Sequence, residues 1–241
     1  MLENIKDEDV LFIDIETVPQ HPNFESLSKA FQDLWEKKTS YFRKENESAA
    51  DVYSRAGIYA EFGKIICISV GLVIYKNEEK YFRLKSFFGK DEKQLLMSFS
   101  GMIDKFSVRK EPFLCAHNGK EFDFPYIARR MLVNGLKLPK ILDVAGKKPW
   151  EVKFLDTLEL WKFGDYKHYT SLNLLTNIFG ISDPKDDIDG SMVADVFWKE
   201  NNLQRIMNYC EKDVFAVVQL FMRYKGESLI KTENIERVDN E

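Results

Sequence analysis

The alternation of apolar and polar residues at positions 10–16 predicts a β-strand near the start of the chain. Because successive side chains of a strand point to opposite faces, one face is apolar, at Leu11, Ile13 and Ile15. The opposite face carries Phe12 and then two acids, Asp14 and Glu16. The strand is therefore expected to lie in a core and to present two like charges on one face near its end.

Later hydrophobic runs predict four more strands, at residues 64–76, 80–89, 112–118 and 152–160. Asn77-Glu78-Glu79 separates the first two runs and indicates a hairpin. Apolar residues at helical spacing predict helices at residues 91–106, 124–134, 171–180, 191–200 and 203–224. The fold class predicted from this order is α/β, a mixed five-stranded sheet flanked by helices.

Two segments stand apart from this pattern. Residues 22–62 form a polar insertion after the first strand, with helical stretches at 24–38 and 49–60, and we expect it to line or cover the substrate cleft. Residues 231–241 are polar and are expected to be a disordered tail. The 241 residues, 44% of them hydrophobic, are enough for one core, so we interpret residues 1–230 as a single domain.

Charge and cysteine content narrow the class of protein. The formal net charge of −4 excludes a molecule that binds polyanions over its whole surface, so a nucleic acid would need a local basic patch or a bound metal. Cys67, Cys115 and Cys210 lie far apart in apolar stretches and are expected to be reduced core residues. No stretch approaches the roughly 20 apolar residues that span a bilayer. A cytoplasmic protein without a membrane segment is the resulting expectation.

Asp14 and Glu16 leave the same face of the first strand and have no lysine or arginine neighbour in it. A divalent cation would offset their repulsion, and hard oxygen ligands favour Mg²⁺ or Mn²⁺ over zinc. Taken alone, the pair is more simply interpreted as a strand end that faces water.

Three further groups also have structural interpretations when taken singly. Asp123 precedes Phe-Pro and has the sequence of an ordinary helix N-cap, while Asn118 and Phe122 fit a turn residue and a core aromatic. Tyr209 and Asp213 are four residues apart in the last helix and therefore share one face, beside its apolar stripe. Taken alone, this pair fits a solvated aspartate and a tyrosine packed on the edge of the core.

The order of these residues carries a resemblance that none of them carries alone. The segments FIDIET (12–17), HNGKEFDFPYI (117–127) and YCEKD (209–213) resemble the three exonuclease motifs of the DEDD superfamily of 3′ to 5′ exonucleases. They resemble most the proofreading domains of family-B DNA polymerases, and EFGKIICISVG and KDDIDG resemble the flanking segments of the stand-alone members. Tyrosine at 209, with asparagine at 208, matches the tyrosine branch (DEDDy) and departs from the histidine branch.

The resemblance implies a ribonuclease-H-like fold in which four carboxylates hold two divalent ions, Mg²⁺ or Mn²⁺, for phosphodiester hydrolysis. The implied metal ligands are Asp14, Glu16, Asp123 and Asp213. Asp14 would bridge the ions, and Tyr209 would orient the attacking water rather than act as a strong base. Thr17, Asn118 and Phe122 match positions that handle the terminal nucleotide.

The implied substrate is the 3′ end of a single-stranded nucleic acid, DNA in preference to RNA, with nucleoside 5′-monophosphates as products and a role in proofreading or DNA repair. Residues 129–153 carry seven basic residues against two acidic ones and form either a phosphate track or a solvated surface. The aromatic residues of KFGDYKHYTS (162–171), namely Phe163, Tyr166 and Tyr169, are either base-stacking or core residues. The alternatives are a nucleic-acid-binding protein that has lost activity and an endonuclease on the same fold.

Overall fold

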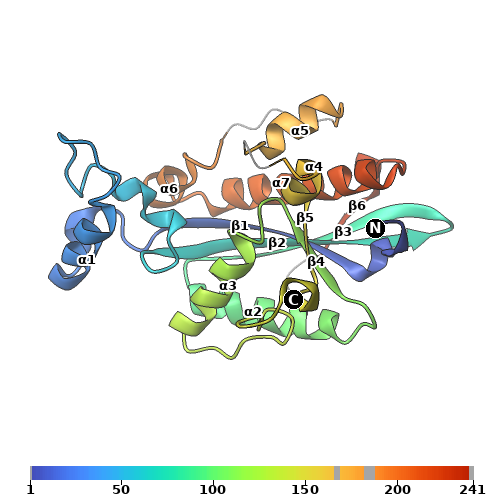
Figure 1. The fold of residues 1–241 in the computed structure, drawn as a ribbon, viewed down its shortest axis with the longest axis horizontal. Helices are drawn as coiled ribbons and strands as arrows, with labels where there is room; N and C mark the ends of the chain where they lie inside the picture. Colours follow the sequence, from blue (N-terminus) through green and yellow to red (C-terminus); the bar gives the residue numbers. More distant parts are fainter. Residues whose placement is uncertain (1, 166–168, 182–187, 239–241) are drawn as a thin grey trace.

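The computed structural model describes residues 2–165, 169–181 and 188–238. A mixed six-stranded sheet runs through the molecule in the order β5-β4-β1-β2-β3-β6 (Figure 1). The strands are β1 (Val10–Pro19), β2 (Gly63–Lys76), β3 (Glu79–Phe88), β4 (Phe113–Ala116), β5 (Phe154–Asp156) and β6 (Ile235–Arg237). β1, β2 and β3 are antiparallel neighbours, whereas β4 is parallel to β1 and β5, and β6 is parallel to β3. The predicted α/β class and mixed, helix-flanked sheet are confirmed.

The sixth strand corrects the prediction of five strands and of a disordered tail. Residues Thr232–Asn234 form a 3₁₀-helix, and β6 follows it along the edge of β3. The Asn234 side chain donates a hydrogen bond to the Lys80 carbonyl at 2.9 Å, and the Val238 N–H donates one to the Leu84 carbonyl at 2.8 Å. A three-residue strand is too short to show an alternating pattern in the sequence. β6 therefore forms because it pairs with the free edge of β3, and its own residues do not predict it.

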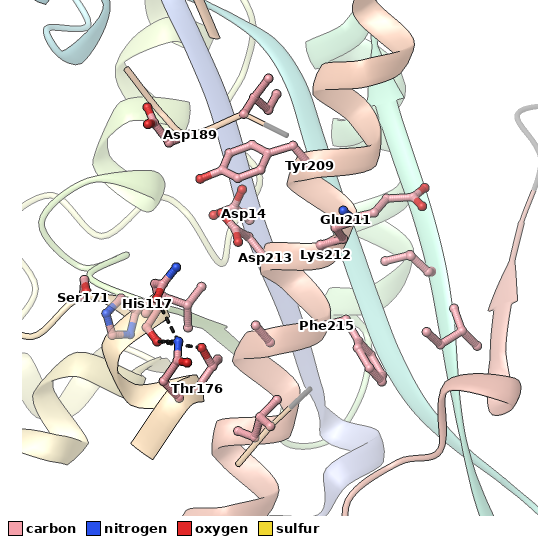
Figure 2. Close-up of a pocket in the computed structure, with 18 of the residues that line it drawn as sticks. Asp14, His117, Ser171, Thr176, Asp189, Tyr209, Glu211, Lys212, Asp213 and Phe215 are labelled. Carbon is pink, nitrogen blue, oxygen red and sulfur yellow. Dashed lines mark hydrogen bonds between the residues drawn. The ribbon is translucent and has the colours of Figure 1, made fainter. Parts of the chain in front are cut away.

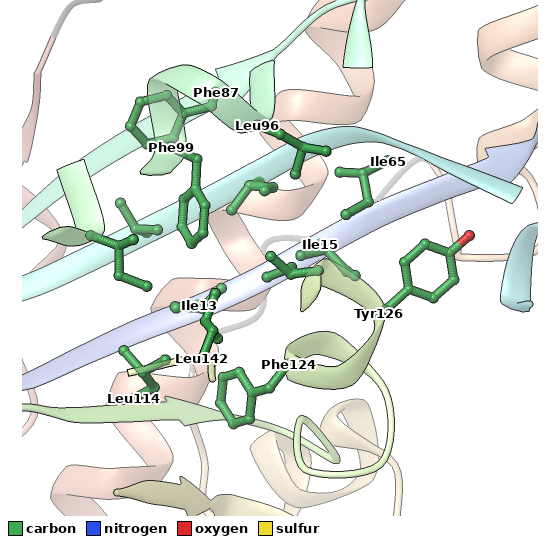
Figure 3. Packing of buried hydrophobic residues seen from close by; sticks show 14 of the residues in the cluster. Ile13, Ile15, Ile65, Phe87, Leu96, Phe99, Leu114, Phe124, Tyr126 and Leu142 are labelled. Carbon is green, nitrogen blue, oxygen red and sulfur yellow. The ribbon is translucent and has the colours of Figure 1, made fainter. Parts of the chain in front are cut away.

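Helices cover both faces of the sheet (Figure 1). α2 (Glu92–Ser107) and α3 (Asp123–Val133) pack on the face that holds Leu11, Ile13 and Ile15, and Figure 3 shows this core. α7 (Leu203–Lys225) crosses the other face, where Phe12 packs edge-on against Phe221 with ring centroids 5.4 Å apart. The predicted alternation of β1 is therefore correct, and its acidic face lies under α7.

The insertion forms a small core of its own at the end of the sheet where β1 finishes (Figure 1). Its α-helix is α1 (Lys29–Thr39), preceded by a 3₁₀-helix at Phe24–Ser26. The predicted helix at 49–60 is instead a series of turns and a 3₁₀-helix at Tyr53–Ile58. Trp35 is fully buried in this core and donates its indole N–H to the Ala49 carbonyl at 2.9 Å.

The segments between β5 and α7 differ most from the prediction. The strand predicted at 152–160 ends at Asp156, because the Asp156 carboxylate accepts a hydrogen bond from the Leu158 N–H at 2.9 Å and so begins α4 (Thr157–Lys162). α5 (Leu172–Ile178) follows, with Ser171 as its N-cap. The predicted helix at 191–200 is a short α6 (Val193–Asp195) that continues as a π-helix at Val196–Glu200.

Three more short 3₁₀-helices lie in the described part of the chain, at Leu2–Asn4, Asp7–Asp9 and Pro149–Glu151. No helix in the described part of the chain has the combination of length and apolar character that crossing a membrane requires.

Candidate active site

β1 presents Asp14 and Glu16 beside a β-bulge. Glu16 is paired with Cys67 of β2, but Thr17 is paired with Ile65, so β2 contributes one extra residue at this point. A bulge bends a strand and redirects the side chains beside it. The bulge therefore lies at the step where β1 passes from the acid pair to Thr17.

Asp123 is the first residue of α3 and not its N-cap, which is Phe122. Its Oδ1 accepts a hydrogen bond from the Ile15 N–H at 3.1 Å, so the start of α3 is fixed directly to β1 between the two strand acids. This contact replaces the capping role expected from the sequence, and it brings the third predicted acid to the first two.

The turn before α3 is constrained by Asn118 and Asp156. Asn118 has a φ of 62°, a left-handed conformation that asparagine tolerates better than most residues. Its N–H donates to Asp156 Oδ1 at 2.9 Å, and the Lys120 N–H donates to Asp156 Oδ2 at 3.1 Å. Asp156 therefore joins this turn to α4, a role that the sequence analysis missed, although an aspartate directly after an apolar run was a readable capping signal.

α7 supplies Tyr209 and Asp213 to the same place. Cys210, between them, directs its thiol to the Asp14 carbonyl with an S···O distance of 3.4 Å, which holds the helix against β1. The Tyr209 hydroxyl is hydrogen-bonded to Asp213, as their positions four residues apart allow. Figure 2 shows Tyr209, Asp14 and Asp213 grouped where α7 crosses β1.

The electrostatics of the four acids indicate a site that favours a cation. Burial, followed by the charges of Asp213, Glu16 and Asp123, raises the pKa of Asp14 well above its ordinary value. Burial and Asp213 do the same to the pKa of Glu16. Burial also raises the pKa of Asp123 to about 7, against the opposing effect of the backbone N–H groups that its carboxylate accepts. Carboxyl groups held this close repel one another when ionised.

One oxygen of this cluster has no partner. Asp14 Oδ2 is buried without a hydrogen bond from any described residue, and the ligand atoms of Asp14, Glu16 and Cys210 lie within 4.8 Å of one another. A buried oxygen without a donor, in a group of carboxylates with raised pKa values, fits a divalent cation bound through oxygen. The carboxylates are thus suited to hold the metal that the sequence predicted, and Mg²⁺ and Mn²⁺ fit this donor chemistry.

A cleft of about 1080 Å³ opens over the acids. Asp14, Tyr209 and Asp213 line it on the side of α7, and His117, Ser171 and Thr176 line the opposite wall (Figure 2). Glu16 and Asp123 lie behind this surface and are not part of its lining. Residues 22–62 contribute no described residue to the lining, which differs from the role expected of the insertion.

The three residues predicted to handle the terminal nucleotide lie beside the acids but outside the cleft lining. Thr17 is half-buried, and its hydroxyl is hydrogen-bonded to Tyr126. Phe122 packs on the same tyrosine, with ring centroids 5.3 Å apart. Asn118 is half-buried in the turn described above. Their role in binding substrate stays a prediction.

The basic stretch at 129–153 is not a track into this cleft. Arg130 is buried and forms a two-pronged ion pair with Glu92, and Lys153 pairs with Glu111 at 2.8 Å. None of the seven basic residues in this stretch, all of them described, lines the cleft. Of the predicted stacking residues, Tyr169 lines the cleft, and Phe163 is 90% exposed outside it. Tyr166 lies outside the described residues, and so do residues 185–187 of the KDDIDG segment.

A model of one known protein family matches most of the chain. A sequence model described as a predicted 3′-5′ exonuclease related to the exonuclease domain of PolB matches residues 58–237. The match contains Asp123, Tyr209 and Asp213 and begins after β1, so the fold itself brings Asp14 and Glu16 to the other three. The mixed sheet is consistent with the ribonuclease-H-like fold of that domain. The chain therefore belongs to this family of predicted 3′-5′ exonucleases, and so it is a nuclease-like hydrolase whose substrate is a nucleic acid.

Proposed function

We propose that this protein is a metal-dependent 3′ to 5′ exonuclease that removes nucleoside 5′-monophosphates from the 3′ ends of single strands, with DNA preferred to RNA. The observation that carries the proposal is the convergence of Asp14, Glu16, Asp123 and Asp213 at one end of β1, with the buried oxygen of Asp14 left without a donor. Tyr209 lies over this group at the surface of the cleft.

The four carboxylates would hold two divalent cations. Asp14, Glu16 and Asp213 would hold the ion that activates the attacking water, and Asp14 and Asp123 would hold the second. When bound, the ions supply positive charge to the phosphodiester as it gains charge in the transition state, and they lower the pKa of water. The hydrogen bond from Ile15 to Asp123 and the packing of β1 fix the carboxylates before any ion binds.

Tyr209 would orient the attacking water. Burial, followed by the charges of Asp213, Glu16 and Asp14, raises the pKa of Tyr209 above its ordinary value of 10.0, so the phenol keeps its proton at neutral pH. A protonated phenol is a poor general base, and because it donates its single proton to the Asp213 carboxylate, its oxygen would orient the water by accepting a hydrogen bond from it. Its hydrogen bond with Asp213 fixes the direction in which the hydroxyl points.

A nuclease assay tests the proposal. The wild-type protein should shorten a 5′-labelled single strand stepwise from its 3′ end with Mg²⁺ or Mn²⁺, and EDTA should stop the reaction. Asp14→Ala and Asp213→Ala should lower the rate at least about 1000-fold, and Tyr209→Phe should lower it about 10- to 100-fold, as expected for an orienting group. Asp104→Asn, an exposed acid on α2, is the matched control.

The substrate panel separates this proposal from its alternatives. It contains single-stranded DNA, duplex DNA, single-stranded RNA and a circular single strand. Cleavage of the circle would identify an endonuclease. Binding of the strands without digestion, in either metal, would identify a nucleic-acid-binding protein without activity and would overturn the proposal.

A further inference from the structure

The two walls of the cleft differ in charge. Among the described residues that line it, the only basic side chains are Lys212 and Arg237, which belong to α7 and β6. The wall opposite Tyr209 is formed by side chains without a formal charge: His117, Tyr169, Ser171, Asn173, Thr176 and Asn177. Burial lowers the pKa of His117, so its ring is neutral at pH 7. This wall is unsuited to phosphate and suited to a base or a sugar.

Tyr169 is the large aromatic side chain of this neutral wall. It is 64% exposed, and its ring packs on that of His117 with centroids 6.2 Å apart and an interplanar angle of 71°. Tyr169 lines the same cleft as Asp14 and Asp213, so its side chain and these acids border one space. Tyr169 therefore combines an open aromatic surface with proximity to the reacting centre.

His117 fixes the backbone next to Tyr169. A carbonyl can only accept a hydrogen bond, so the contact of 3.0 Å between His117 Nε2 and the Thr170 oxygen makes Nε2 the protonated nitrogen. Nδ1 then accepts from the Thr157 hydroxyl, 2.9 Å away at the start of α4. The ring thus connects residue 170 to α4, so the neighbouring Tyr169 is attached to a rigid element.

We propose that Tyr169 stacks on the 3′-terminal nucleobase of the single strand and that His117 is a positioning residue that holds Tyr169 in place. The inference rests on the proposed function, because the acids determine which part of the strand lies beside them. The scissile phosphate must meet the acids and their cations, so the base attached to the same nucleotide extends to the opposite, uncharged wall. Stacking tolerates every base, as a nuclease that removes successive nucleotides requires.

A mutant cycle between the side chain and the base tests this assignment. Binding is measured by fluorescence anisotropy in an Asp14→Asn background, which leaves the strand intact, with short 5′-labelled single strands that end in a normal or an abasic 3′ nucleotide. Tyr169→Ala should weaken binding of the normal strand about 10-fold, as expected for one lost stacking contact. It should not weaken binding of the abasic strand, and Tyr169→Phe should keep wild-type affinity for both.

Two further measurements separate stacking from other causes. The 10-fold loss should be the same at low and high salt, because stacking releases no counterions. His117→Ala should reproduce the loss on the normal strand and add nothing to Tyr169→Ala. Trp150→Ala is the control, because Trp150 is 75% exposed and lies outside the cleft lining.

The inference is overturned if Tyr169→Ala weakens both strands equally, if Trp150→Ala causes the same loss, or if the normal strand does not bind measurably. The proposed function is judged separately, by digestion with the wild-type protein. A protein that shows the coupling and digests nothing would keep the stacking site and lose the exonuclease assignment.

Discussion

Asp14 is the residue at which burial and charge are in greatest conflict. It lies on the core strand β1, and its Oδ2 has no hydrogen bond from a described residue. Burial, followed by the charges of three other acids, raises its pKa. A buried polar oxygen without a donor costs about 1–3 kcal/mol, which a cation would offset. Function therefore requires an arrangement that weakens the metal-free fold, as is common at active sites.

Asp14→Asn should stabilise the metal-free protein. The substitution removes a negative charge and supplies an amide in place of the unsatisfied oxygen, so the free energy of unfolding in EDTA should rise by about 1–2 kcal/mol. Urea unfolding of the variant and the wild type measures the difference. The exposed Asp104→Asn should change nothing, and a destabilised Asp14→Asn would contradict the conflict described here.

Metal binding should depend on pH because Asp123 must lose its proton. Its pKa is raised from 3.8 to about 7, so the folded protein holds this proton more tightly than the unfolded chain does. The contribution of the protonated Asp123 carboxyl to the free energy of unfolding is complete below about pH 4 and is lost as the pH rises through about 7. The increase in Tm caused by Mn²⁺ should therefore grow from pH 6 to pH 8. Thermal unfolding with and without Mn²⁺ measures it, and an equal increase at both pH values would disprove the coupling.

At the scale of elements, the long periodic segments were predicted, whereas the three-residue strands β5 and β6 were given wrong bounds or missed. The alternation in β1 extends over several residue pairs, and the apolar stripe of α7 extends over several helical turns. Both elements lie as predicted. β5 has three residues, and the cap at Asp156 converts the rest of the predicted strand into α4. The bulge after Glu16 and the hydrogen bond from Ile15 to Asp123 depend on contacts between distant segments, which one sequence does not reveal.

α2 and α3 are connected by a buried ion pair that also reaches the insertion. Arg130 donates to both oxygens of Glu92, at 2.9 and 2.6 Å, and to the Ala60 carbonyl at 2.8 Å. Glu92 also accepts from the Ile65 N–H at 2.7 Å. Every charge in this group has its partners, so a substitution would leave one buried charge uncompensated.

Arg130→Met should lower the free energy of unfolding by about 3–5 kcal/mol, because Glu92 would stay buried without its cation. Chemical denaturation at pH 7 measures the loss. Arg129→Met is the matched control, because Arg129 is the exposed neighbour on the same helix. Similar losses in the two variants would show that the ion pair has no special role.

At the scale of the whole molecule, both ends of the described chain hold α7, the helix that carries Tyr209 and Asp213. In its first half, Glu211 accepts hydrogen bonds from Ser86 at 2.9 Å and from Arg237 of β6 at 2.8 Å. At its end, Lys225 pairs with Asp7. Segments outside the three motifs therefore fix the helix that completes the site.

Asp7→Asn should loosen this attachment in a pH-dependent way. Burial alone would raise the pKa of Asp7, but hydrogen bonds from Lys225 and from the Tyr75 hydroxyl, at 2.8 Å, outweigh it and hold the pKa below its ordinary value of 3.8. A carboxyl with a lowered pKa stabilises the fold above the pKa of the unfolded chain, and this contribution is lost as the pH falls through the folded value. The variant should therefore be less stable than the wild type by about 3 kcal/mol at pH 7. The difference should begin to shrink below about pH 4, where the unfolded chain takes up a proton, and should be lost as the pH falls through the lowered folded pKa, where the wild-type carboxyl also becomes neutral. Urea unfolding at a series of pH values measures the difference, with the exposed Glu8→Gln as control. A difference that stays constant down to the lowest pH at which both proteins fold would show that charge at Asp7 does not hold the end of α7.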